Sequence, residues 1–163
     1  MATLDDILLA RDLRSERQRQ LLQEVGPDKA LCQLTVVPPG ADKQLSGLTL
    51  RLGREGLAAV MDSALCGPLC HEALTAAGYE ALWIAPLAPL EAKRIAVCLE
   101  DTHPHGRVFD IDVLQNDGTP IEREDIGHAP RRCYLCNEPA KVCARSRAHS
   151  IDELLQAFRS LTS

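Results

Sequence analysis

The chain has 163 residues, of which 45% are hydrophobic, and this length and composition suffice for one domain with a sizeable core. A net charge of −5 and an aromatic content of 3% disfavour general nucleic-acid binding, which uses a basic surface and stacking aromatic side chains. No stretch approaches the 18 or more apolar residues of a membrane span.

The N-terminal half predicts two helical regions separated by a strand. Thr3 or Asp5 can cap a helix that continues to about Val25, before a Gly-Pro pair. Residues 31–37 are typical of a strand that ends at two prolines. Residues 53–78 have apolar positions at helical spacing, and we expect a second helical region there, broken at Gly67-Pro68 and resumed over Leu69–Ala77.

The following segment predicts a run of strands. Residues 81–85 and 94–100 have the composition of strands, and residues 107–114 form a third. The loop at 102–106 is expected to join the last two as a hairpin. Asn116-Asp117-Gly118 indicates a turn, after which Thr119–Ile121 can continue the sheet.

The C-terminal part predicts irregular structure and then a helix. Residues 125–149 are rich in cysteine and arginine and show no periodicity, whereas Ser150 can cap a last amphipathic helix. We therefore expect an α+β fold, in which a mainly antiparallel sheet carries packed helices. The whole chain, 1–163, is expected to form one domain with a Cys/Arg-rich segment at 131–149.

Asp110 and Asp112 are the most informative pair of polar residues. Side chains alternate along a strand, so the two carboxylates share one face with Cα atoms roughly 6–7 Å apart. Mg²⁺ prefers oxygen ligands and leaves positions open for substrate phosphates, so the pair predicts a site for Mg²⁺ or Mn²⁺. Gly106 permits close approach of a phosphate chain to the backbone. The alternative is an ordinary solvated strand face.

Four sequence segments resemble the family of apo-citrate lyase phosphoribosyl-dephospho-CoA transferases. The run from His103 to Val113, HPHGRVFDIDV, is similar to the HPxGRxxDIDV motif of that family. The other three segments are Leu8–Arg14 followed by Gln18, Thr35–Gly40 followed by Lys43, and Pro130–Cys136 followed by Cys143, Arg145 and His149. The resemblance is in order along nearly the whole chain, and it is weak between residues 50 and 98.

The resemblance implies a nucleotidyltransferase-like fold and activity. Enzymes of this family transfer the phosphoribosyl-dephospho-CoA prosthetic group from triphosphoribosyl-dephospho-CoA to a serine of the acyl carrier subunit of citrate lyase, and release diphosphate. Asp110 and Asp112 would hold the metal, and His103 is a candidate to touch substrate, although an ordinary loop histidine is the alternative. The candidates for substrate binding, each of which could instead be a solvated surface residue, are Arg11, Arg14, Lys43, Gly106, Arg107, Arg131, Arg132 and Arg145.

Three of the seven cysteines are grouped with a histidine near the C-terminus. The spacing Cys133-x2-Cys136-x6-Cys143-x5-His149 is compatible with a structural zinc site, and the alternative is that the cysteines are small buried hydrophobic residues. The odd cysteine count and the lack of an export signal predict a reducing, cytoplasmic location in which the other thiols are free.

The segment 131–149 also carries five basic residues and one acid, a net charge of +4 in an acidic chain. An acidic acyl carrier protein could dock on this charge. Two other functions stay open: a small zinc-binding interaction module centred on this segment, and a related nucleotidyltransferase with a different donor or carrier.

Overall fold

The protein is an α+β structure built on one four-stranded antiparallel sheet, as the sequence predicts. The computed structural model describes all 163 residues. The strands are β1 (Ala30–Val36), β2 (Leu69–Thr75), β3 (Gly78–Ala85) and β4 (Asp110–Leu114), in the order β2-β3-β1-β4. The helices are α1 (Leu4–Leu22), α2 (Leu48–Met61), α3 (Pro89–Thr102), α4 (Ala140–Ser146) and α5 (Ile151–Leu161).

The strand order results from two interleaved βαβ units. The first unit is β1-α2-β2 and the second is β3-α3-β4. Strand β3 lies between β1 and β2, and strand β1 lies between β3 and β4. This is the split βαβ arrangement of ferredoxin-like folds. As a result β1 lies in the middle and pairs with both β3 and β4, while β4 forms one edge of the sheet.

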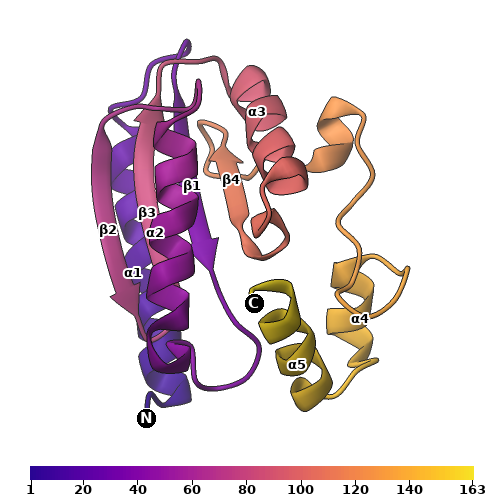
Figure 1. The fold of residues 1–163 in the computed structure, drawn as a ribbon. Coiled ribbons are helices and arrows are strands. Elements are labelled where there is room, and N and C mark those ends of the chain that lie inside the picture. The colour runs from indigo at the N-terminus through magenta and orange to yellow at the C-terminus, as the bar shows by residue number, and fades with distance from the viewer.

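One face of the sheet forms the main core under α2 and α3. Alternate residues of β1, β3 and β4 point into it, and the largest of these side chains, Tyr79 and Trp83, are fully buried. Helix α2 approaches this face so closely that a Cβ at Gly53 would overlap the Tyr79 ring. Figure 1 shows α2 in front of the sheet and α1 behind it, so the sheet is covered on both sides.

The opposite face has an apolar end and a polar end. Leu31, Leu82 and Leu114 form a small cluster with Leu21 and Leu22 from the last turn of α1. Beyond this cluster the face becomes polar, and its side chains form what we call the polar strip: Glu80 of β3, Gln33 and Thr35 of β1, and Asp110 and Asp112 of β4.

The helix starts that the sequence predicts at both ends of the chain are confirmed. Thr3 and Asp6 form a capping box at the N-terminus of α1, and Ser150 and Glu153 form one at α5. In each box the hydroxyl accepts from a free backbone N–H of the first turn, which a helix start otherwise leaves without a partner.

The expectation of a helix over Leu69–Ala77 is wrong, because these residues form strand β2 and the turn into β3. Thr75 pairs with Gly78, and the Thr75 hydroxyl accepts from the Ala77 N–H, which closes a tight hairpin. Alanine, leucine and glutamate are helix formers, but pairing with the buried strand β3 supplies backbone partners and contacts that outweigh this preference.

The expected strand at 94–100 is also wrong, since these residues belong to α3. Pro89 is the first residue of this helix, where its fixed φ and missing N–H are tolerated. Ala92 and Ala96 lie one helical turn apart and both face the core. There is consequently no hairpin at 102–106, and the predicted strand 107–114 begins only at Asp110, after a 3₁₀ turn over Gly106–Val108.

The predicted turn at 116–118 is present, and after it the chain returns to pair briefly with β4 through Pro120. Residues 125–139 are mostly irregular, as expected, but the Cys-rich segment also contains the short helix α4. In Figure 1 α4 and α5 lie side by side, away from α1 and β2. None of the helices combines the length and apolar character that crossing a membrane requires.

Candidate active site

A large cavity runs along strand β4 and the C-terminal segment. Its volume is about 830 Å³, and its walls come from β1, α3, β4 and residues 120–154. The charged side chains that line it are Lys93, Glu100, Arg107, Asp110, Asp112, Glu122, Arg123, Glu124, Arg131 and Lys141. A cavity in which acidic and basic groups meet in this way suits a phosphorylated ligand and a cation.

Asp110 and Asp112 both line this cavity from the same face of β4. Asp110 pairs with Thr35 of β1 and Asp112 with Gln33, while Ile111 between them is buried in the core. The Gln33 amide donates to Asp112 Oδ2 at 3.4 Å, and Gln18 of α1 in turn donates to Gln33. The pair is therefore held at a fixed spacing, with Asp110 exposed and Asp112 partly buried.

The electrostatic environment of the pair favours a bound cation. Burial raises the pKa of Asp112 to about 7, and the nearby charge of Asp110 adds to the rise, while the positive charges of Lys93 and Arg14 oppose it. Two carboxylates this close repel each other when both are ionised. A divalent cation between them would remove the repulsion, so the donor set fits a hard metal ion.

Glu100 of α3 connects the edge of β4 to two arginines. Its Oε2 accepts from the Ile111 N–H at 3.0 Å, on the side of β4 that no strand covers. Its carboxylate also lies 3.1 Å from Arg123 and 3.4 Å from Arg131. Burial raises the pKa of Glu100, whereas Arg131 and the Ile111 amide oppose the rise.

Arg131 and Arg107 hold the turn that precedes β4. Arg131 donates to the backbone carbonyls of Phe109 at 2.6 Å and Gly106 at 2.7 Å. The Arg107 guanidinium lies 4.5 Å from the centre of the Tyr134 ring, a cation–π contact with the Cys-rich segment. A Cβ at Gly106 would overlap the carbonyl of Glu100, so the close approach that this glycine makes is to α3.

Other candidates from the sequence lie outside the cavity. Arg14 lies 3.4 Å from Glu80 in the polar strip, and Lys43 donates to the Pro38 carbonyl at 2.8 Å. The His103 ring packs against Phe109 at 4.9 Å between centroids and faces Glu55 of α2. Arg11, Arg132 and Arg145 also do not line it. The structure thus places Arg107 and Arg131 in the same cavity as the two aspartates, whereas the other basic candidates do not line it.

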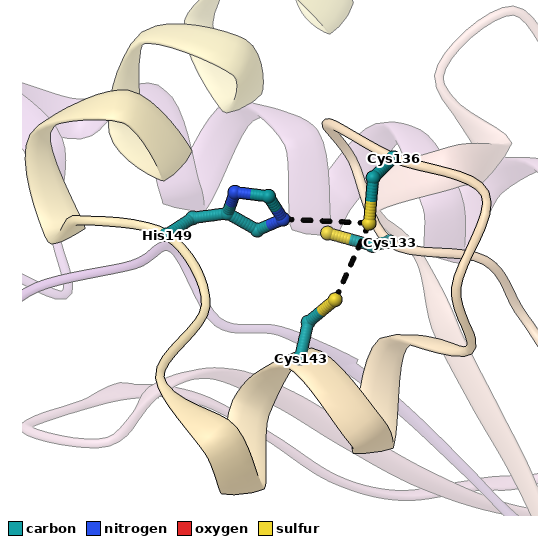
Figure 2. A group of neighbouring side chains, drawn as sticks. All are labelled: Cys133, Cys136, Cys143 and His149. Carbon is teal, nitrogen blue, oxygen red and sulfur yellow. Dashed lines mark hydrogen bonds between the residues drawn. The ribbon is translucent and has the colours of Figure 1, made fainter.

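Cys133, Cys136, Cys143 and His149 converge, although they come from a loop, α4 and the residue before the cap of α5. Figure 2 shows their side chains pointing toward one another. One ligand atom from each residue can be chosen so that all four lie within 4.8 Å of one another. Cys136 Sγ is 3.4 Å from Cys143 Sγ and 3.4 Å from His149 Nε2. The four side chains could hold a metal ion.

Several cavity residues were not predicted from the sequence. Lys93 lies just before the expected strand 94–100 and Glu100 at its end, so their common helical face could not be recognised. Arg123 and Lys141 lie in the C-terminal part, which carries no periodic pattern. The sequence signal for this helical face is the spacing of Lys93, Ala96 and Glu100, which places the three residues on one side of a helix.

Comparison with known proteins identifies relatives along the full chain. The profile of the family described as apo-citrate lyase phosphoribosyl-dephospho-CoA transferase matches residues 2–163. A protein of Streptococcus pyogenes named as a probable enzyme of this kind is 36% identical over 163 residues, which cover 97% of this chain and 84% of that protein. An Escherichia coli protein with the same name is 34% identical over 163 residues, covering 98% and 87%.

The contacts of Glu100 predict that its carboxylate is required for stability. Replacing Glu100 by Ala leaves the Ile111 N–H without its acceptor and two arginines without their buried partner, which we expect to cost about 3–5 kcal/mol of unfolding free energy. Asp101→Ala is the matched control, because Asp101 binds the same Arg123 from an exposed position and should cost less than about 1 kcal/mol. Urea unfolding of both variants measures the difference, and equal midpoints would contradict the assigned role.

Proposed function

The chain belongs to the family of apo-citrate lyase phosphoribosyl-dephospho-CoA transferases, and from this premise we propose its donor, its acceptor and its metal ions. The donor is triphosphoribosyl-dephospho-CoA and the acceptor is a serine of the acyl carrier subunit of citrate lyase. Diphosphate is released. The observation that carries the proposal is the family match over residues 2–163 together with two aspartates in a cavity lined by basic side chains.

The chemistry is nucleotidyl transfer. The serine Oγ attacks the phosphorus next to the ribose, the bond from that phosphorus to the diphosphate breaks, and the electron pair leaves with the diphosphate. Asp110 and Asp112 would hold Mg²⁺ or Mn²⁺, which supplies charge neutralisation for the triphosphate. We propose that Arg107, which lines the same cavity as Asp110, contacts a phosphate oxygen.

Residues around the pair fix its geometry rather than react. Gln33 orients Asp112 through its amide, and Glu100 restrains β4 between the two aspartates through the Ile111 N–H. Arg131 donates to the carbonyls of Phe109 and Gly106. We therefore propose that Arg131 contributes to substrate binding indirectly, by positioning the turn that carries Arg107. Preorganised charge of this kind needs little rearrangement during the reaction.

The remaining basic candidates are proposed for contacts at a greater distance from the reacting phosphorus. Arg14 lies at the polar strip, and its charge reaches Asp112. Burial lowers the pKa of Lys43, and the positive charge of Arg11 lowers it further, so Arg11 and Lys43 are near each other. We propose that these residues bind the part of the donor that lies away from its triphosphate. His103 packs against Phe109 and faces Glu55, and it does not line the cavity, so we propose no catalytic role for it.

The non-catalytic alternative, a small zinc-binding module, is not favoured. Its cysteine cluster is present, but Cys133, Cys143 and His149 also line the cavity that contains the two aspartates. We propose that a structural Zn²⁺ at Cys133, Cys136, Cys143 and His149 fixes the cavity wall. Three thiolates and an imidazole are a common ligand set for structural zinc.

Replacing either aspartate should abolish transfer without unfolding the protein. Asp110→Asn and Asp112→Asn keep the side-chain shape but remove a negative ligand, and a loss of about 4 kcal/mol of transition-state stabilisation lowers the rate about a thousandfold. Mass spectrometry of the apo carrier after incubation with donor and Mg²⁺ measures the transfer. Asp117→Asn, in the exposed turn after β4, is the control and should react normally. A folded double mutant that modified the carrier at the wild-type rate would refute the proposal.

Zinc should copurify with the protein at about one ion per chain. Cys136→Ser removes one ligand and is expected to lower both the zinc content and the melting temperature, because metal binding to such a set contributes directly to folding. Cys66→Ser changes an exposed cysteine outside the cluster and should alter neither. Zinc analysis by atomic emission and a thermal melt test this, and a zinc-free protein with the same melting temperature as Cys136→Ser would exclude a structural ion.

The acidic carrier is proposed to dock at the basic surface of α4. Arg145 and Arg147 are exposed there, next to Lys141 and Ala144 of the cavity wall. Charge reversal at Arg145 should raise the carrier KM several-fold at low salt, with a smaller effect at high salt, while the donor KM stays constant. Arg19→Glu, on the exposed side of α1 and away from α4, is the matched charge reversal. Steady-state kinetics at two salt concentrations measure the carrier KM of each variant. An unchanged carrier KM in the Arg145 variant would mean that this surface binds another partner.

A further inference from the structure

Lys93 is a buried lysine without a partner in the cavity. It lies in the middle of α3 with only 5% of its surface exposed, and it lines the same cavity as Asp110 and Asp112. Its ammonium group forms no hydrogen bond, and no carboxylate oxygen lies within 4.0 Å of it, since it is in none of the ion pairs of the structure. Its Nζ atom is not itself fully enclosed, since Thr49 Oγ1 is the only fully buried side-chain polar atom that lacks a hydrogen-bond partner, so the ammonium group opens onto the cavity.

The other buried charged groups of the protein all have partners. Glu80 contacts Arg14, Arg17 and His71, and Glu100 contacts two arginines and a backbone N–H. A lysine retained for stability would be expected to pair in the same way, because breaking or omitting a buried pair is costly. The ammonium group of Lys93 instead faces the cavity unpaired, where an anionic ligand would supply the partner that the protein does not.

The surroundings of Lys93 define the kind of anion. Helical spacing places Lys93 and Glu100 on one side of α3, two turns apart, and both side chains line the cavity. Asp112 and Glu100 are close enough that the charge of Lys93 acts on both of them. A phosphate chain in this cavity would have the lysine and a cation held by Asp110 and Asp112 as its positive partners, and proteins commonly bind polyphosphates with such a pair.

We propose that Lys93 is a catalytic residue that binds a phosphate oxygen of the donor triphosphate beside Asp110 and Asp112. The assignment rests on the proposed function and extends it to a residue in the segment where the family resemblance is weak. During transfer the bond between serine Oγ and phosphorus forms, and the bond to the diphosphate breaks. The serine proton passes to water. The diphosphate takes the electron pair, and the fixed positive charge of Lys93 stabilises the negative charge that it gains.

The test measures phosphate binding apart from transfer. Inorganic triphosphate with Mg²⁺ is titrated calorimetrically into wild-type protein, Lys93→Met, Lys93→Arg and the control Arg94→Gln. Arg94 is the next residue on α3, is exposed and lies outside the cavity. We expect Lys93→Met to weaken triphosphate affinity about ten- to a hundredfold, because a hydrogen bond to a charged group is lost. Lys93→Arg should recover part of the loss, and Arg94→Gln should bind like wild type.

Transfer kinetics on the same variants separate this inference from the proposed function. A lower kcat and weaker inhibition by diphosphate in Lys93→Met, with an unchanged carrier KM, support the assignment. Wild-type triphosphate affinity in a folded Lys93→Met, or in Lys93→Gln if the Met variant does not fold, overturns it even when the wild-type protein modifies the carrier. If the wild-type protein transfers nothing but Lys93→Met still loses triphosphate affinity, the phosphate-binding role of Lys93 stands, and its catalytic role falls together with the proposed function.

Discussion

The edge of strand β4 is the constraint on which the cavity depends. No strand covers the outer side of β4, so its outward backbone groups need other partners, as buried polar groups generally do. Glu100 provides one by accepting from the Ile111 N–H, and the same carboxylate contacts Arg123 and Arg131. One side chain of α3 therefore fixes the strand that carries the aspartates, and also connects it to the segment that forms the opposite wall. The same contacts of Glu100 therefore shield the sheet edge from solvent and hold the two walls of the cavity together.

The parts of the fold that follow from local rules could be predicted from the sequence. Capping residues Thr3 and Ser150 indicated two helix starts, and the alternation around Ile111 placed Asp110 and Asp112 on one face. The elements that depend on tertiary pairing could not. Residues 69–75 contain helix formers but pair with β3, and residues 94–100 contain strand formers but follow a proline that starts a helix. Short apolar runs carry no signal that separates these cases.

The candidate site could be predicted only where its residues are close in the sequence. The two aspartates and the four potential zinc ligands each occur within one short segment, and the structure brings the members of each group together. Individual residues that the sequence suggested for the site have different positions in the structure. Arg107 lines the cavity, whereas His103, four residues earlier, faces α2. Arg107 belongs to the 3₁₀ turn Gly106–Val108 and His103 precedes it, and such a change of direction has no sequence pattern of its own. Lys93 shows the converse: its position in the cavity depends on the register of α3 on the sheet.

The central position of β1 has a consequence for synthesis of the chain. Leu34 pairs with Ala81 on one side and with Ile111 on the other, so both neighbours of the middle strand are made long after it. A growing chain on the ribosome therefore presents β1 with two open edges, and afterwards with one, until β4 has emerged. Contacts between residues so distant in sequence close large loops, which slows folding relative to helical proteins of similar size. The same strand that organises the finished sheet therefore has unpaired edges while the sheet is incomplete, and unpaired strand edges promote aggregation.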